Sequence, residues 1–225
     1  GHPVGDKILA TVGTVIRTGG FSLTVDAYQI KVKDRIAITS TLTGAAVSAI
    51  LVANGLSPDI SAQYYTNAID TRTRGLDVVA TYRHSLGDFA KLSWNIGYNY
   101  NKTIITHVKD NPPELDSLGS GFVLFDRLSR SNLTVNLPRT KFYISNLTTI
   151  GRFTLNTRVV RFGAFKSFAN PVIVGGKETF PNDREFGSKW ITDAELAFDV
   201  NDALQVAVGA NNLFNVYPTK LPKAL

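Results

Sequence analysis

The stretch Lys189–Pro218, KWITDAELAFDVNDALQVAVGANNLFNVYP, decides the fold class expected for this chain. Apolar and polar residues alternate along its first arm, which is typical of a β-strand because successive side chains point to opposite faces. Asn201-Asp202 marks a tight turn, and the alternation resumes over Leu204–Ala210. Each arm has about ten residues, which is enough for a tilted strand to cross a bilayer.

The same alternation recurs along the chain and predicts six more strands, joined in hairpins at Gly19-Gly20, Gly87-Asp88 and Gly151. They are Lys7–Thr18, Phe21–Arg35, Thr71–Leu86, Lys91–Asn101, Lys141–Ile150 and Arg152–Phe162. In the second strand the apolar residues occupy odd-numbered positions up to Ala27 and even-numbered positions from Tyr28 onward. Either a β-bulge or the exit of the strand from a membrane would explain this shift of parity. In Lys141–Ile150, Asn146 and Leu147 stand against the expected alternation of apolar and polar residues.

The connections between these strands alternate in length. Short turns are followed by long connections at Ile36–Asp70, His107–Arg139 and Gly163–Ser188, and Gly44–Asn54 in the first of them is expected to form a short helix. Transmembrane barrels have short periplasmic turns and long extracellular loops. The sequence therefore predicts an all-β fold, an antiparallel transmembrane β-barrel wall of about eight strands.

The distribution of charge agrees with this prediction. Seven charged or amide side chains of the strands fall on the face opposite the aliphatic one: Asp77, Arg83, Asn95, Asn99, Arg158, Asp193 and Glu195. A lysine or arginine facing lipid at the midplane costs about 2–4 kcal/mol. The polar face is therefore expected to be the lumen, and the aliphatic face to contact outer-membrane lipid. The net charge of +6 comes from lysines and arginines scattered along the sequence, which indicates a cationic surface and no nucleic-acid partner.

Two motifs carry a resemblance to a known family. The first is the segment from Tyr65 to Asp77, YTNAIDTRTRGLD, in which Thr-Arg-Gly-apolar-acid opens a strand. The second combines Val200-Asn201-Asp202 with GANNLFN from Gly209 to Asn215. Both motifs, in this order within a chain of hairpins, resemble the C-terminal barrel portion of a TonB-dependent outer-membrane receptor.

The resemblance implies a 22-stranded barrel closed by an N-terminal plug, in the outer membrane of a Gram-negative bacterium. Such receptors bind a scarce small-molecule chelate, for example a ferric siderophore or haem, and the TonB complex pulls on the plug to admit it. The sequence shows no plug, TonB box or final strand, so residues 1–225 are expected to be one part of such a barrel domain.

Catalytic and metal chemistry is not predicted. The three histidines, His2, His84 and His107, have no metal-ligand spacing, and cysteine is absent. Gly175-Gly176-Lys177 lacks the other residues of a phosphate-binding loop and is interpreted as a turn, and Asp193 with Glu195 as solvated lumen charges. The chain is accordingly expected to be no enzyme and to need no cofactor.

The long connections contain the candidate ligand contacts. Arginine binds anionic groups through its planar fork, and aromatic rings stack on flat ligands. The candidates are Tyr64, Tyr65, Phe122, Phe125, Arg127 and Arg130. The alternative is that these side chains only pack the loops or form the aromatic girdle.

Two other architectures are compatible with the strand pattern. A complete eight-stranded outer-membrane barrel with a structural or adhesion role would have its lumen filled by side chains. A soluble β-sandwich acting as a binding module would bury the aliphatic faces of two sheets against each other. The small side chains expected in the lumen, among them Gly97 and Gly209, argue against the first.

Overall fold

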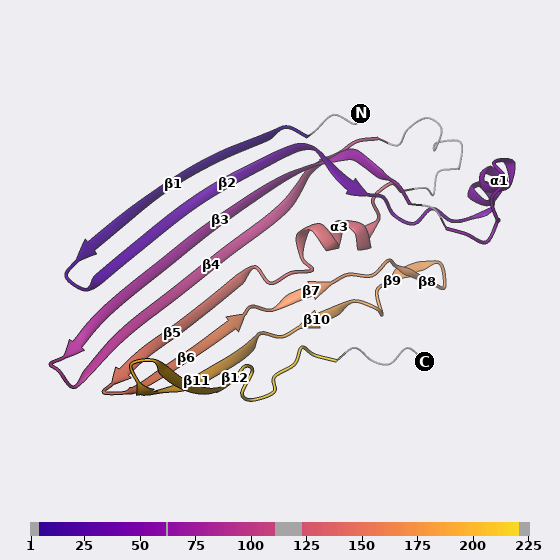
Figure 1. The fold of residues 1–225 in the computed structure, drawn as a ribbon. Coiled ribbons are helices and arrows are strands. Elements are labelled where there is room, and N and C mark those ends of the chain that lie inside the picture. The colour runs from indigo at the N-terminus through magenta and orange to yellow at the C-terminus, as the bar shows by residue number, and fades with distance from the viewer. Residues whose placement is uncertain (1–4, 62, 111–122, 221–225) are drawn as a thin grey trace.

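The computed structural model describes residues 5–61, 63–110 and 123–220, and it is dominated by one large antiparallel sheet (Figure 1). Eight strands lie in the order β1-β2-β3-β4-β5-β6-β11-β12, so neighbours in the sheet are also consecutive long strands of the chain. Their bounds are β1 Lys7–Thr18, β2 Phe21–Ile38, β3 Tyr65–Leu86, β4 Ala90–Val108, β5 Thr140–Ile150, β6 Phe153–Phe162, β11 Lys189–Asn201 and β12 Leu204–Ala210.

The sheet is open. β1 and β12 form its two edges and do not pair with each other, so the eight strands do not close into a small barrel. No second large sheet lies in the described part of the chain, and thus nothing there covers the aliphatic face as a sandwich would require. Of the three architectures compatible with the sequence, only a wall segment of a larger barrel matches this topology.

The register places apolar and polar side chains on opposite faces. Trp94 of β4 is opposite Tyr82 and Asn146, and the row continues through Thr157 and Ala194. Directly opposed residues share a face. We call the face that carries Trp94 the outer face and the opposite one the lumen face. In the half of the sheet nearer the short turns, which we call the lower half, the lumen face carries most of the charged side chains of the strands. They include Arg158 opposite Asp193.

Aromatic pairs on the outer face of β11 mark two levels. Near the long connections, Trp190 packs edge-to-face on Phe142 with ring centroids 6.3 Å apart. Near the short turns, Phe198 packs against Phe153 at 4.7 Å. Trp190 and Phe198 are eight residues apart, which corresponds to roughly 27 Å along the strand and, at a tilt of about 40°, to a height of about 20 Å. The apolar band of an outer-membrane barrel is about 25 Å tall and flanked by aromatic girdles, so this spacing fits a membrane-spanning wall.

Several strands extend further than their alternation predicted. β2 continues to Ile38, β3 already begins at Tyr65, and β4 continues to Val108. These extensions carry mixed polar and apolar residues and lie beyond the upper aromatic level, outside the apolar band of the wall. A strict alternation is not needed there, and the connections are correspondingly shorter than predicted.

The bulge considered for β2 is not at the parity shift. Pairing with β1 and β3 runs without interruption from Phe21 to Val32, and the irregularity lies between Val32 and Ile36. There Asp34 has a φ of 51°, and its backbone N–H donates to the Asp70 carboxylate at 2.9 Å. The change of polarity after Ala27 therefore occurs in a regular strand, as expected for a strand leaving a membrane.

The long connections contain structure of their own. The first holds α1, Ala45–Ala53, which confirms the predicted loop helix. The second holds α3, Arg127–Thr134, a helix that the sequence analysis did not predict. The third forms two short hairpins, β7 Phe165–Ser167 with β10 Arg184–Phe186, and β8 Val172–Val174 with β9 Lys177–Thr179. Gly175 and Gly176 make the turn between β8 and β9 with positive φ, as interpreted from the sequence.

The clusters of buried apolar side chains lie at the upper end of the sheet, where the long connections are, and not along its wall. Ala68, Ile69, Leu124 and Phe125 form one cluster, and in another Leu42 packs with Val47 and Leu51 of α1. Both consist of residues from the long connections and the strand ends next to them. Neither helix of the described residues is long and apolar enough to span a membrane.

Candidate functional site

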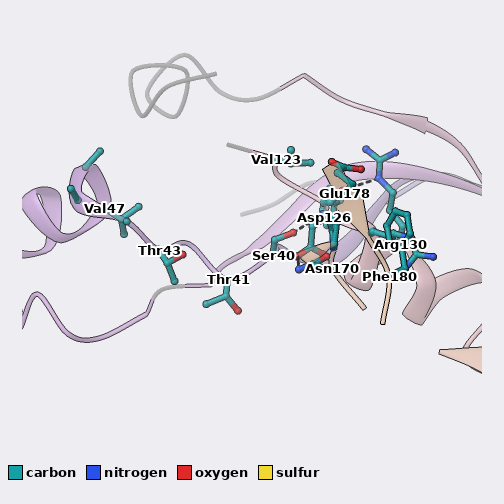
Figure 2. Close-up of a pocket in the computed structure, with 16 residues that line it drawn as sticks. Ser40, Thr41, Thr43, Val47, Val123, Asp126, Arg130, Asn170, Glu178 and Phe180 are labelled. Atoms are coloured by element: carbon teal, nitrogen blue, oxygen red, sulfur yellow. Dashed lines mark hydrogen bonds between the residues drawn. The ribbon is translucent and has the colours of Figure 1, made fainter. Parts of the chain in front are cut away.

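The three long connections meet at the upper end of the sheet. We call the described residues of these connections, 39–61, 63–64, 123–139 and 163–188, the loop assembly. A cavity of about 740 Å³ lies between them (Figure 2). Its walls come from all three connections: Ser40 and Val47 from the first, Asp126 and Arg130 from the second, Asn170, Glu178 and Phe180 from the third.

Asp126 joins the three connections at the base of the cavity. It caps α3, since its carboxylate accepts the backbone N–H of Ser129 at 2.8 Å. The second carboxylate oxygen accepts the Asn170 side-chain amide at 2.6 Å, and the backbone N–H of Asp126 donates to Ser40 Oγ at 2.7 Å. The Ser40 backbone N–H donates in turn to the carbonyl of Leu124 at 2.9 Å.

The carboxyl group of Asp126 is ionised in this setting. Its burial works against ionisation, but hydrogen bonds from the backbone N–H of Ser129 and the amide of Asn170 outweigh that cost, so the pKa of Asp126 lies below its ordinary value. Asp126 therefore carries a negative charge that is already used within the protein and is not free for a ligand.

Arg127 is held by the third connection. Its two terminal nitrogens donate to the Asp183 carboxylate at 2.5 and 2.6 Å, and Nη1 also donates to the carbonyl of Ala169 at 2.6 Å. The guanidinium lies 4.3 Å from the ring centroids of both Phe168 and Phe180. The hydrogen bond from Arg127 holds the pKa of Asp183 below its ordinary value, and the same bond raises the pKa of Arg127.

Arg130 differs from Arg127 in having free donors. Its Nε donates to the carbonyl of Phe125 at 2.7 Å, which fixes the direction of the guanidinium. Its two terminal nitrogens bond to none of the described residues, and the side chain is exposed in the cavity. In Figure 2, Arg130 and Phe180 stand at one end of the cavity, and Val47 of α1 stands at the other. The cavity thus has a charged end, where the oriented fork of Arg130 stands beside the carboxylates of Asp126 and Glu178, and an apolar end at α1.

The six predicted ligand contacts are distributed unevenly. Phe125, Arg127 and Arg130 line the cavity, although Phe125 is only 1% exposed and forms its base. Tyr64 packs against both buried clusters, and Tyr65 opens β3 with its side chain exposed, so neither lines the cavity. Phe122 lies outside the described residues.

The sequence interpretation missed the residues that shape the cavity from the first and third connections. Ser40, Asn170 and Phe180 have no local motif, because their role depends on contacts more than 40 residues away. The start of α3 did have a signal, because aspartate, here Asp126, is one of the preferred helix N-cap residues.

Comparisons with known proteins agree with this architecture. The family model described as "TonB dependent receptor-like, beta-barrel" matches residues 10–213. A search of the curated proteins found no match. Among solved structures, the outer membrane transporter YddB from Escherichia coli has a TM-score of 0.61 and 12% identity over 94% of this chain.

Two further structures show the same fold. The siderophore receptor PirA from Acinetobacter baumannii has a TM-score of 0.53 and 14% identity over 92% of this chain. A mutant of the ferric enterobactin receptor PfeA from Pseudomonas aeruginosa has a TM-score of 0.53 and 16% identity over 92%. The present chain spans 25% to 29% of the length of these three proteins. With the family model covering most of its strands, the chain belongs to the TonB-dependent receptor-like β-barrel family.

Proposed function

We propose that this chain forms part of the wall and the extracellular rim of an outer-membrane receptor that takes up a ferric siderophore or a similar chelate by energised transport. The cavity in the loop assembly, with the free guanidinium of Arg130, is the observation that carries this proposal. Chelates of this class present anionic oxygen atoms, and an arginine fork binds such groups bidentately.

The open sheet is the basis for the architectural part of the proposal. Within the described residues, the outer edges of β1 and β12 pair with no other strand, and in an outer-membrane barrel their backbone groups must pair with further strands. We infer a larger barrel of 22 strands with a plug, of which residues 1–225 supply eight neighbouring strands. The TonB complex would act through that plug, and this chain would contribute no catalytic step.

Iron accumulation tests the function directly. A strain lacking the gene is supplied with a panel of ferric siderophores and complemented with the wild-type gene, in the presence and absence of TonB. We expect uptake of one chelate class to require both the gene and TonB. Uptake that continues unchanged without the gene, for every chelate tested, would overturn the proposal.

Arg130 variants test the site. Replacing Arg130 with Ala removes a charged hydrogen-bond donor, which is worth about 1.5–3 kcal/mol, so chelate affinity should fall about 10- to 100-fold. Arg130→Lys keeps the charge and should recover part of it. Arg17→Ala makes the same change at the opposite end of the sheet and should leave affinity unchanged. Equal affinity of Arg130→Ala and wild type would show that the ligand binds elsewhere.

A further inference from the structure

Four cationic side chains that are far apart in the sequence lie together on the outer face. Lys31 of β2 is directly opposite Arg72 of β3, and Arg74 of β3 is directly opposite Lys102 of β4. Directly opposed side chains share a face with Cβ atoms about 5 Å apart, and two residues along a strand add about 7 Å. These four residues, which we call the basic patch, therefore lie within an area roughly 10 Å across.

The basic patch has no internal counter-charge. Like charges directly opposite each other destabilise a sheet, and here two such pairs lie side by side. None of the four cations forms an ion pair with any described residue. Arg74 donates to the Gln29 side chain at 2.8 Å, which leaves its charge uncompensated. Asp70, the next acid on this face of β3, accepts the backbone N–H of Asp34. An anion from outside the chain would remove the repulsion.

The position of the basic patch relative to the membrane identifies that anion. Phe142 of the upper aromatic level is directly opposite Tyr98 of β4, and Lys102 follows Tyr98 on the outer face by four residues. The patch therefore begins about 13 Å further along the tilted strand, or about 10 Å higher. Phosphate groups of lipids lie just beyond the aromatic girdle of a barrel. On the same stretch of β2 the apolar residues Ile30 and Val32 face the lumen, and Lys31 faces the lipid side. The polarity of the strand is thus inverted at this level.

We propose that the basic patch binds the phosphate groups of an anionic lipid in the outer leaflet. Arginine binds phosphate bidentately, and lysine and arginine stems can lie along the apolar wall while their charges reach the headgroup layer. The inference rests on the proposed location in the outer membrane, and it is independent of the chelate that the cavity takes.

Lipid binding by the whole gene product, solubilised in neutral detergent, tests the basic patch. A fluorescent bisphosphorylated lipid A analogue is titrated into the protein, and its anisotropy gives the Kd. Each lysine or arginine near an anionic lipid surface contributes about fivefold to binding. We therefore expect the Kd of R74Q/K102Q to rise about 25-fold, and that of K31Q/R72Q to rise equally.

The control pair K91Q/K177Q removes the same charge from the lumen face of β4 and from β9, and its Kd should equal that of wild type. The dephosphorylated analogue should bind wild type more weakly than the phosphorylated one binds R74Q/K102Q, because that variant keeps Lys31 and Arg72. Heat-modifiable migration in electrophoresis verifies that each variant is folded. If one of the two patch variants does not fold, the other still tests the proposal.

Three results would overturn the proposal. The first is an unchanged Kd in a folded patch variant, and the second is an equal loss of lipid affinity in the control pair. The third is displacement of the probe by inorganic phosphate at equal phosphate concentration, which would mean that the site binds free phosphate. Membrane fractionation separates this inference from the proposed function. Absence from the outer membrane would overturn both, whereas an outer-membrane protein with unchanged lipid affinity would overturn only the lipid site.

Discussion

The strand wall and the loop assembly of this chain are stabilised in different ways. The wall consists of long runs of regular strand pairing; for example, Phe21–Val32 of β2 pairs without interruption with both β1 and β3. Its side chains are sorted by face and by depth in the membrane. The loop assembly has little regular pairing and depends on a few polar side chains, chiefly Asp126 and Arg127, above a small apolar core. Many equivalent contacts make the wall tolerant of single changes, whereas the loop assembly depends on individual residues.

The largest effect is expected from the core of the loop assembly. Phe125 is 1% exposed and packs with Leu124 against Ala68 and Ile69. Truncation of a buried phenylalanine costs about 3–5 kcal/mol, so Phe125→Ala should strongly reduce hydrogen-exchange protection across residues 123–135 while leaving β11 protected. Val123→Ala, at a residue that is 49% exposed, is the control. Equal protection in both variants would contradict this description of the core.

A charge placed on either face of the wall tests which side contacts lipid. Ala194 lies on the outer face midway between Trp190 and Phe198, and Asn156 lies on the lumen face opposite Glu195. Ala194→Arg should lower the free energy of unfolding from phospholipid by about 2–4 kcal/mol, as expected for an arginine at the midplane. Asn156→Arg should have a much smaller effect. The reverse order would mean that the two faces are exchanged.

Asn146 is a polar exception on the outer face of the wall. It is 8% exposed, its Oδ1 accepts the Thr148 hydroxyl at 2.5 Å, and its Nδ2 has no partner among the described residues. Replacing both side chains by apolar groups (N146L/T148V) should stabilise the protein by about 1–3 kcal/mol in urea unfolding, because a buried unsatisfied donor is removed. Asn95→Leu, which deprives Tyr143 of an acceptor on the lumen face, should instead destabilise it.

The smallest effect is expected from pH. The pKa values of Asp183 and Asp126 are lowered in the folded loop assembly, so their contribution to its stability is present above the ordinary aspartate pKa of 3.8 and lost as pH falls through the folded values. Hydrogen-exchange protection of residues 123–135, corrected for intrinsic rates, should therefore decrease below about pH 4. Asp183→Asn should already reduce protection at neutral pH and flatten this dependence. An unchanged pH profile in Asp183→Asn would contradict a role for the Arg127–Asp183 pair.

The two arginines of α3 show how far sequence reasoning reaches at the candidate site. Arg127 and Arg130 were predicted together as ligand contacts, because both stand near aromatic residues in a long connection. In the structure Asp183 and two phenylalanine rings hold Arg127, whereas the terminal nitrogens of Arg130 bond to no residue that the structure describes. The difference arises from the third connection, more than 40 residues away, which no local pattern around α3 could reveal.

The sequence by itself determined the strands, the tight turns and the face that each strand residue occupies, because alternation is a local property of extended backbone. It also carried the family motifs at Arg74-Gly75 and in Gly209–Asn215. Only the tertiary structure decided the open edges of the sheet, the meeting of three connections around Asp126, and the gathering of Lys31, Arg72, Arg74 and Lys102. In the sequence these cations are scattered. Strand register brings them together, because it sets which residues of different strands become neighbours.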